Sequence, residues 1–149
     1  MNEPVDEPST TIRVERTFRA PAQDVFDAWT SVEVLRRWWH AEHDWETPHA
    51  ELDLRVGGAL RITMRDPLRS EDHGGGGQFT EIDSPRRIAF TWAWDDDPST
   101  RQLIEVDFTD HGDRTTVVLT NSGIPAQAKD DHVVGWQNSF DNLEAALGS

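Results

Sequence analysis

The sequence predicts an α+β fold in which a curved antiparallel sheet of about seven strands wraps around a long C-terminal helix. Two further, shorter helices are expected near the N-terminus. Three patterns support this prediction: two-residue alternation of apolar side chains in several short segments, turn residues between them, and an apolar stripe with helical spacing near the C-terminal end. Because such a sheet needs a cover for its apolar face, the last helix is expected to pack against it.

The N-terminal part predicts one strand followed by two short helices. Residues 11–18 alternate apolar and polar side chains, with Arg16 as the one interruption of the apolar face. Apolar residues at helical spacing predict a helix over 20–29. Thr30 is expected to cap a second helix that runs to the tryptophan pair, with Glu33 completing a capping box.

Six more strands and a long helix are expected after these elements. The strands are separated by turn residues, and residues 66–77, which end in four glycines, are expected to form a flexible connection. The predicted strands cover 51–56, 59–65, 78–82, 87–94, 102–109 and 114–120. The stripe that predicts the long helix consists of Val133, Trp136, Phe140, Leu143 and Leu147.

Composition excludes several classes of protein. The 149 residues suit one domain, expected over 11–149 after a flexible N-terminus over 1–10. There is no cysteine, which removes disulfides and thiol chemistry. The net charge of -14 disfavours nucleic acid and anionic membranes as partners. No secretory signal and no run of ~18 apolar residues is visible, so a cytoplasmic location is expected.

Four stretches of the chain resemble the activator of heat-shock chaperone ATPase homologue-like (AHSA-type) family of the START-like SRPBCC superfamily. They are Phe18–Trp39, Asp53–Pro67, Gly77–Trp92 and Val134–Leu147. The resemblance implies the helix-grip fold, with a ligand cavity between the sheet and the C-terminal helix. Proteins of this superfamily range from binders of lipids and polyketides to cyclases and chaperone co-factors, so the fold alone does not identify an activity.

Aromatic residues are the main candidates for the lining of such a cavity. The chain has seven tryptophans and six phenylalanines, and pockets of this kind are mostly apolar with a few polar groups that orient the ligand. The side chains expected to contact a ligand are Trp39, Met64, Phe79, Glu81, Trp92, Trp94, His132, Trp136 and Phe140.

Two readings of Glu81 follow from strand alternation. If Phe79 points inward, Glu81 does too, and an apolar cavity would raise the pKa of its carboxyl toward values suited to proton transfer. If Ile82 is the inward residue, Glu81 lies in water. Arg61 is expected to face solvent, because its apolar neighbours claim the inward face. His132 lies either at the cavity mouth or in water.

Metal and nucleotide sites have little support in the sequence. His40 and His43 are three residues apart, but they fall in a segment of loop composition without an HExxH motif. The glycine run 74–77 is not followed by the Lys-Ser or Lys-Thr pair of a phosphate loop. No GxSxG motif indicates a nucleophile. Neither a metal nor a cofactor is therefore expected.

Three functions remain open from the sequence. The first is binding of a small hydrophobic or aromatic molecule in the cavity. The second is an enzyme of the polyketide cyclase or dehydratase type, in which Glu81 or His132 moves protons. The third is a co-factor of a chaperone ATPase, a partner that the resemblance implies and no sequence feature supports. Edge strands and the tryptophan-rich loop could support a homodimer.

Overall fold

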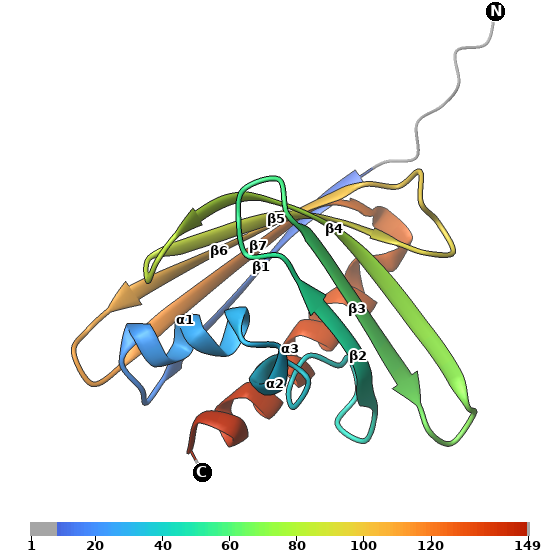
Figure 1. Cartoon of the computed structure of the whole chain (residues 1–149). Helices are drawn as coiled ribbons and strands as arrows, with labels where there is room; N and C mark the ends of the chain where they lie inside the picture. Colours follow the sequence, from blue (N-terminus) through green and yellow to red (C-terminus); the bar gives the residue numbers. More distant parts are fainter. Residues whose placement is uncertain (1–8, 149) are drawn as a thin grey trace, which may run out of the picture.

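The computed structural model describes residues 9–148 and confirms the α+β helix-grip fold (Figure 1). All seven strands form one antiparallel sheet in the order β1-β7-β6-β5-β4-β3-β2. The strands are β1 (Ser9–Phe18), β2 (Glu46–Leu52), β3 (Ala59–Asp66), β4 (Glu71–Asp83), β5 (Arg87–Trp94), β6 (Gln102–Asp110) and β7 (Thr115–Pro125). The helices are α1 (Ala22–Thr30), α2 (Val32–Leu35) and α3 (Lys129–Gly148), with the 3-10 turn η1 (Ala126–Ala128) before α3.

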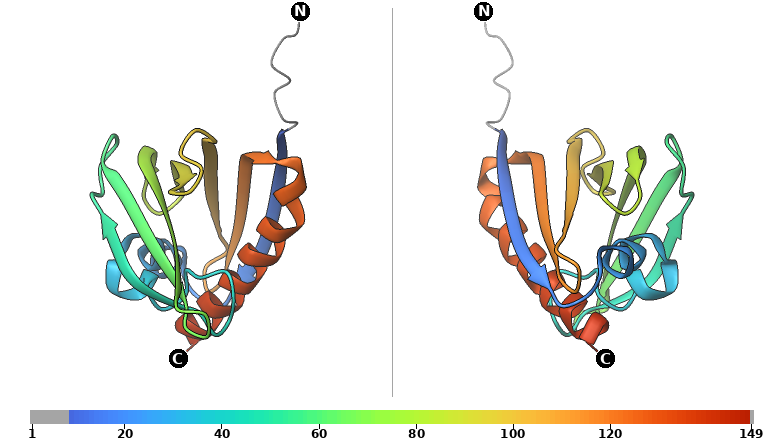
Figure 2. Two further views of the ribbon diagram at one scale, coloured as in Figure 1. Left: turned by 90° about the vertical axis from the view of Figure 1, so that its right-hand side faces the viewer. Right: turned by 90° about the vertical axis from the view of Figure 1, so that its left-hand side faces the viewer.

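The sheet curves around the helices, and the core lies on its concave side. Figure 2 shows α3 running along one side of the curved sheet next to β1, and Figure 1 shows α1 and α2 beneath the arch of the sheet. The buried stripe of α3 contains Trp136, Phe140 and Leu143, as the helical spacing predicted. Alternate side chains of β5 and β6 complete the core from the sheet.

Arg16 interrupts the apolar face of β1 because it reaches the edge of α3. Its guanidinium donates hydrogen bonds to Asp141 at 2.6 Å and to Gln137 at 2.9 Å. The same guanidinium lies 5.9 Å from the centre of the Phe140 ring. The side chain thus links the first strand to the last helix across the edge of the core.

The second helix differs from its prediction in both its cap and its length. The cap is Ser31, whose side chain accepts a hydrogen bond from the Val34 backbone, whereas the Thr30 hydroxyl donates back to the Phe26 carbonyl of α1. A threonine at a helix C-terminus can satisfy a carbonyl of its own helix, so it is not free to cap the next one. The helix ends at Leu35, Trp38 lies in the turn that follows it, and Trp39 lies in irregular backbone after that turn.

Two strands also differ from their predictions. β2 begins at Glu46 and ends at Leu52, so it lies several residues earlier than expected. β4 begins at Glu71 and includes the four glycines that were expected to form a flexible connection. A Cβ at Gly75 would lie 2.5 Å from Cζ2 of Trp92, so the indole ring occupies the space where a side chain would stand. This glycine is therefore a packing residue of the sheet.

The first strand and the last helix both begin earlier in the chain than the apolar patterns that predicted them. Of the predicted flexible N-terminus, residues 1–8 lie outside the described part, whereas Ser9 and Thr10 already belong to β1. α3 begins at Lys129, earlier than the apolar stripe, and Pro125 precedes the turn that leads into it. Within residues 9–148, no helix has the length and apolar character needed to cross a membrane.

Candidate functional site

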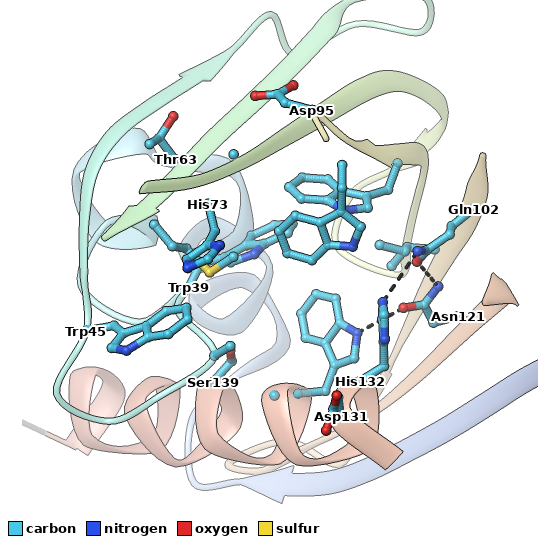
Figure 3. A pocket seen from close by; sticks show the side chains of 18 of the residues that line it. Trp39, Trp45, Thr63, His73, Asp95, Gln102, Asn121, Asp131, His132 and Ser139 are labelled. Carbon is cyan, nitrogen blue, oxygen red and sulfur yellow. Dashed lines mark hydrogen bonds between the residues drawn. The ribbon is translucent and has the colours of Figure 1, made fainter. Parts of the chain in front are cut away.

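A cavity of about 510 Å³ lies between the concave face of the sheet, α3 and the loop that follows the tryptophan pair. Its wall is largely apolar and aromatic, which is typical of sites for small organic ligands. The larger apolar side chains of the lining are Trp39, Trp45, Met64, Trp92, Trp94, Ile104 and Trp136. Figure 3 shows Trp39 and Trp45 at the pocket, with the labelled polar side chains distributed around it.

Strand alternation and ring packing explain the aromatic wall. Trp92 and Trp94 lie on the same face of β5, and their rings meet edge to face at 5.2 Å. Trp39 stacks on Trp92 at 5.7 Å and contacts Trp136 of α3 at 5.4 Å. The wall is therefore built by rings from three elements that support one another.

The loop that carries Trp39 is held to α3 by side chains of the helix. Asn138 donates to the Ala41 carbonyl at 2.9 Å, and Ser139 donates to the His40 carbonyl at 2.9 Å. These bonds satisfy carbonyls that have no strand or helix partner, because the loop has no regular structure. The position of Trp39 in the cavity wall is therefore linked to that of α3.

The far end of the same loop is held against β4. The Trp45 indole stacks on the His73 imidazole at 5.0 Å, with 7° between the two planes (Figure 3). Both residues line the cavity, and both are only partly buried. The stacked pair thus closes one side of the pocket between the loop and the sheet.

A chain of hydrogen bonds runs along one wall of the cavity, and we call its four residues, Trp136, Asn121, Gln102 and His132, the polar strip. The Trp136 indole N–H donates to Oδ1 of Asn121 at 3.1 Å. The Asn121 amide donates to Oε1 of Gln102 at 3.0 Å, and Nε2 of Gln102 lies 3.4 Å from Nε2 of His132. Asn121 is 1% exposed and Gln102 2%, so both amides are buried.

The rim of the cavity is acidic. Its exposed lining residues include the carboxylates Asp72, Asp95, Asp96 and Asp131. Arg61 donates two hydrogen bonds to Asp95, at 2.9 and 2.8 Å, and these lower the pKa of that carboxyl. Arg61 is solvent-exposed, as the alternation of β3 predicted, and its contact with the cavity is indirect.

His40 and His43 lie outside the cavity and contact different partners. Thr47 donates its hydroxyl hydrogen to the Trp39 carbonyl, so it accepts a hydrogen bond from Nδ1 of His40 at 3.1 Å. Burial lowers the pKa of His40, and the nearby His43 lowers it further. His43 pairs with Asp141 at 2.9 Å. Among residues 9–148, no three His, Cys, Asp or Glu side chains are grouped to hold a metal ion.

The structure brings most of the predicted ligand contacts together around the cavity. The residues from that set that line it are Trp39, Met64, Trp92, Trp94, His132 and Trp136. Phe79 and Phe140 do not belong to the lining: Phe79 packs against Phe90 at 6.1 Å, and Phe140 packs against Phe18 at 5.7 Å. Both are core residues under the cavity wall.

Glu81 also lies away from the cavity. The register of β4 against β5 shifts between Phe79 and Glu81, so the two residues no longer share a face as the alternation required. The Glu81 carboxylate is exposed and accepts from Nε of Arg87 at 2.9 Å. The second reading of this residue, in which Glu81 lies in water, therefore describes its position.

Sequence reasoning missed several polar and aromatic residues of the site. Gln102 shares its face of β6 with Ile104, and Asn121 shares its face of β7 with Leu119, so alternation alone could have placed both inward. Trp45 lies in a loop, where no periodic pattern indicates direction. Its position depends on the stacking with His73.

Comparison with known proteins identifies relatives of this arrangement. The model of the family described as Activator of Hsp90 ATPase homolog 1-like protein matches residues 19–148. A search among curated proteins returned no match.

Solved structures of similar proteins cover nearly the whole chain. A protein from Chromobacterium violaceum is 26% identical, with a TM-score of 0.83 over 91% of this chain and 96% of its own. An AHSA1 protein from Silicibacter pomeroyi is 26% identical, with a TM-score of 0.79 over 93% and 98%. An AHSA1-like protein from Aeromonas hydrophila is 27% identical, with a TM-score of 0.75 over 93% and 92%. The chain belongs to the Activator of Hsp90 ATPase homolog 1-like family.

Proposed function

We propose that the protein binds a small hydrophobic or aromatic molecule in the cavity between the sheet and α3. The observation that carries this proposal is the lining itself: five tryptophan rings surround a space of about 510 Å³. Ligand sites commonly have volumes of about 300–1,000 Å³, with apolar walls and a few polar groups. Each indole offers a flat apolar face, so a planar ligand gains both buried area and ring contacts.

Native mass spectrometry of the purified protein tests whether a small molecule co-purifies. Tryptophan fluorescence titration with planar aromatic compounds then tests for saturable binding. Trp94→Ala is the informative variant because Trp94 is only partly buried and lines the cavity. Loss of one aromatic contact is expected to weaken binding by about two- to tenfold, which corresponds to about 0.5–1.5 kcal/mol.

Glu81→Gln serves as the control for this titration. Glu81 lies outside the cavity with Arg87, so the affinity for a cavity ligand should not change. The proposal fails if no compound from a broad hydrophobic panel gives saturable binding. It also fails if Trp94→Ala and Glu81→Gln bind every such compound as tightly as the unchanged protein.

A cyclase or dehydratase activity is the second candidate, and it rests on His132. This imidazole lines the cavity, and its Nδ1 donates to the Ala128 carbonyl at 2.8 Å, which leaves Nε2 as the acceptor. Nε2 is therefore the atom that could take a proton from a bound substrate, once its hydrogen bond to the Gln102 amide at 3.4 Å is given up. If His132→Ala converts a substrate at the rate of the unchanged protein, this role is excluded.

The description of the family suggests the third candidate, activation of the Hsp90 ATPase. Purified Hsp90 with and without this protein gives a direct test through its rate of ATP hydrolysis. An unchanged rate, together with no complex in analytical ultracentrifugation, would exclude this function. Neither result depends on the cavity, so this experiment separates the protein partner from the small ligand.

A further inference from the structure

The direction of the hydrogen bonds in the polar strip is determined by its two ends. The Trp136 indole can only donate, so the atom of Asn121 that faces it must be the amide oxygen. The Ala128 carbonyl can only accept, so Nδ1 of His132 must carry the hydrogen. Between these ends, the Asn121 amide donates to Gln102, and the Gln102 amide donates to His132.

Among the described residues 9–148, this fixed direction leaves one N–H group of each of the two amides unused within the strip. A side-chain amide nitrogen carries two N–H groups, and each of the two amides uses one of them within the strip. Both amide oxygens already accept one hydrogen bond each. A buried N–H without an acceptor is rarer in proteins than a carbonyl oxygen with one of two lone pairs used. Within the strip, the second N–H group of each amide therefore has no acceptor.

We propose that the natural ligand carries a carbonyl oxygen that accepts hydrogen bonds from the second N–H groups of Gln102 and Asn121. This inference rests on the proposed function and narrows its ligand class to neutral, planar, carbonyl-bearing molecules such as aromatic ketones, quinones and lactones. A carbonyl oxygen suits the strip because its two lone pairs can accept from both amides at once.

The charge of the cavity rim selects among ligands with oxygen acceptors. A carboxylate or phosphate would also accept from the two amides, but the rim carries Asp72, Asp95, Asp96 and Asp131. Arg65 pairs with Asp72 and Arg61 with Asp95, so the cations nearest to the rim are already engaged. Because these two pairs compensate Asp95 and Asp72, the repulsion of an anionic ligand comes mainly from Asp96 and Asp131, and a neutral carbonyl compound would not be repelled.

The test compares 9-fluorenone with fluorene, two planar tricyclic compounds that differ in one carbonyl oxygen. Tryptophan fluorescence titration measures both affinities in the unchanged protein, in Gln102→Met, in Asn121→Leu and in the control Thr63→Val. Thr63 also lines the cavity but is not part of the strip. Losing one hydrogen bond is expected to reduce the preference for fluorenone over fluorene by about two- to tenfold in the two strip variants.

Infrared spectroscopy of fluorenone bound to the unchanged protein gives a second readout that needs no variant. The carbonyl stretch should lie at a lower frequency than in an apolar solvent if the oxygen accepts hydrogen bonds. The inference is supported by this lower frequency and by a preference that falls in the strip variants but not in Thr63→Val.

Two results would overturn the inference, and they have different meanings for the cavity. In the first result, both compounds bind, the carbonyl stretch matches that in an apolar solvent, and all variants keep the same preference. The cavity would then be a ligand site, but the strip would not recognise a carbonyl. If neither compound binds, both the carbonyl inference and the proposed binding of planar aromatic molecules fail.

Discussion

Gly75 supports the aromatic wall, and replacing it with alanine tests how tightly strand β4 packs against Trp92. A Cβ at this position would lie 2.5 Å from Cζ2 of Trp92 and 2.8 Å from the carbonyl oxygen of Ala93. Real Cβ atoms essentially never approach so closely. The ring or the strand must therefore move, and because the Ala93 oxygen belongs to the backbone, a side-chain rotation alone cannot relieve the contact.

The expected effect of Gly75→Ala is the difference between two opposing contributions. Extra volume in a packed site costs about 1–3 kcal/mol. Replacing glycine by alanine also removes conformational freedom from the unfolded chain, which stabilises the fold by about 0.4–1 kcal/mol where the backbone is compatible. Because backbone atoms take part in the clash, we expect a net loss of about 1–2 kcal/mol in the free energy of unfolding.

Urea unfolding followed by tryptophan fluorescence measures this loss, and Gly74→Ala is the matched control on the same strand. A Cβ at Gly74 would meet Oδ2 of Asp95 at 2.7 Å, the end of an exposed side chain that can turn away. The control should stay within about 0.5 kcal/mol of the unchanged protein. A Gly75→Ala variant as stable as the Gly74→Ala variant would refute the tight packing of the ring on this strand.

Three further predictions concern charge and the core. Arg16 and, to a smaller extent, His43 lower the pKa of Asp141, so its stabilisation is present above the ordinary pKa of a carboxyl and is lost as pH falls through the lowered value. Asp141→Asn should therefore cost about 0.5–1 kcal/mol at pH 7 and less as the pH is lowered below the ordinary pKa of a carboxyl, compared by urea unfolding. A loss that does not change with pH would contradict the pairing. Phe140→Ala should lower the free energy of unfolding by about 3–5 kcal/mol, measured by the same method, because the Phe140 side chain is fully buried. A loss under about 1 kcal/mol would show that Phe140 is not part of the core. Arg87→Met should lower the free energy of unfolding by about 1–2 kcal/mol, and by less in high salt, because three carboxylates share this cation. A loss of stability that salt does not change would argue against an electrostatic origin.

Periodic patterns in the sequence predicted the parts of the fold that depend on a buried face. Two-residue alternation predicted β5 with the bounds that the structure has, and the spacing of Trp136, Phe140 and Leu143 predicted the buried face of α3. These patterns arise because one side of each element meets the core. The number of strands and their antiparallel arrangement followed from the turns between them.

Interactions between distant residues account for what the sequence did not predict. The glycines of β4 have the composition of a loop, but Gly75 lies in the sheet because the Trp92 ring occupies its side-chain space. The register shift in β4 reverses the direction of Glu81, and no local pattern marks such a shift. The polar strip joins β6, β7 and α3, so it becomes visible only when those three elements are placed together.

The order of strands in the sheet has a consequence for protein synthesis. Among the strands of residues 9–148, β1 pairs only with β7, and Ile12 lies opposite Asn121. The first strand therefore has no partner in this sheet until more than a hundred further residues have been made. The helix that completes the cavity follows β7. A growing chain on the ribosome therefore lacks both the strand that pairs with its first strand and one wall of the cavity. The proposed ligand binding would become available only when synthesis has passed α3, so such a ligand would stabilise the finished domain but not its shorter precursors.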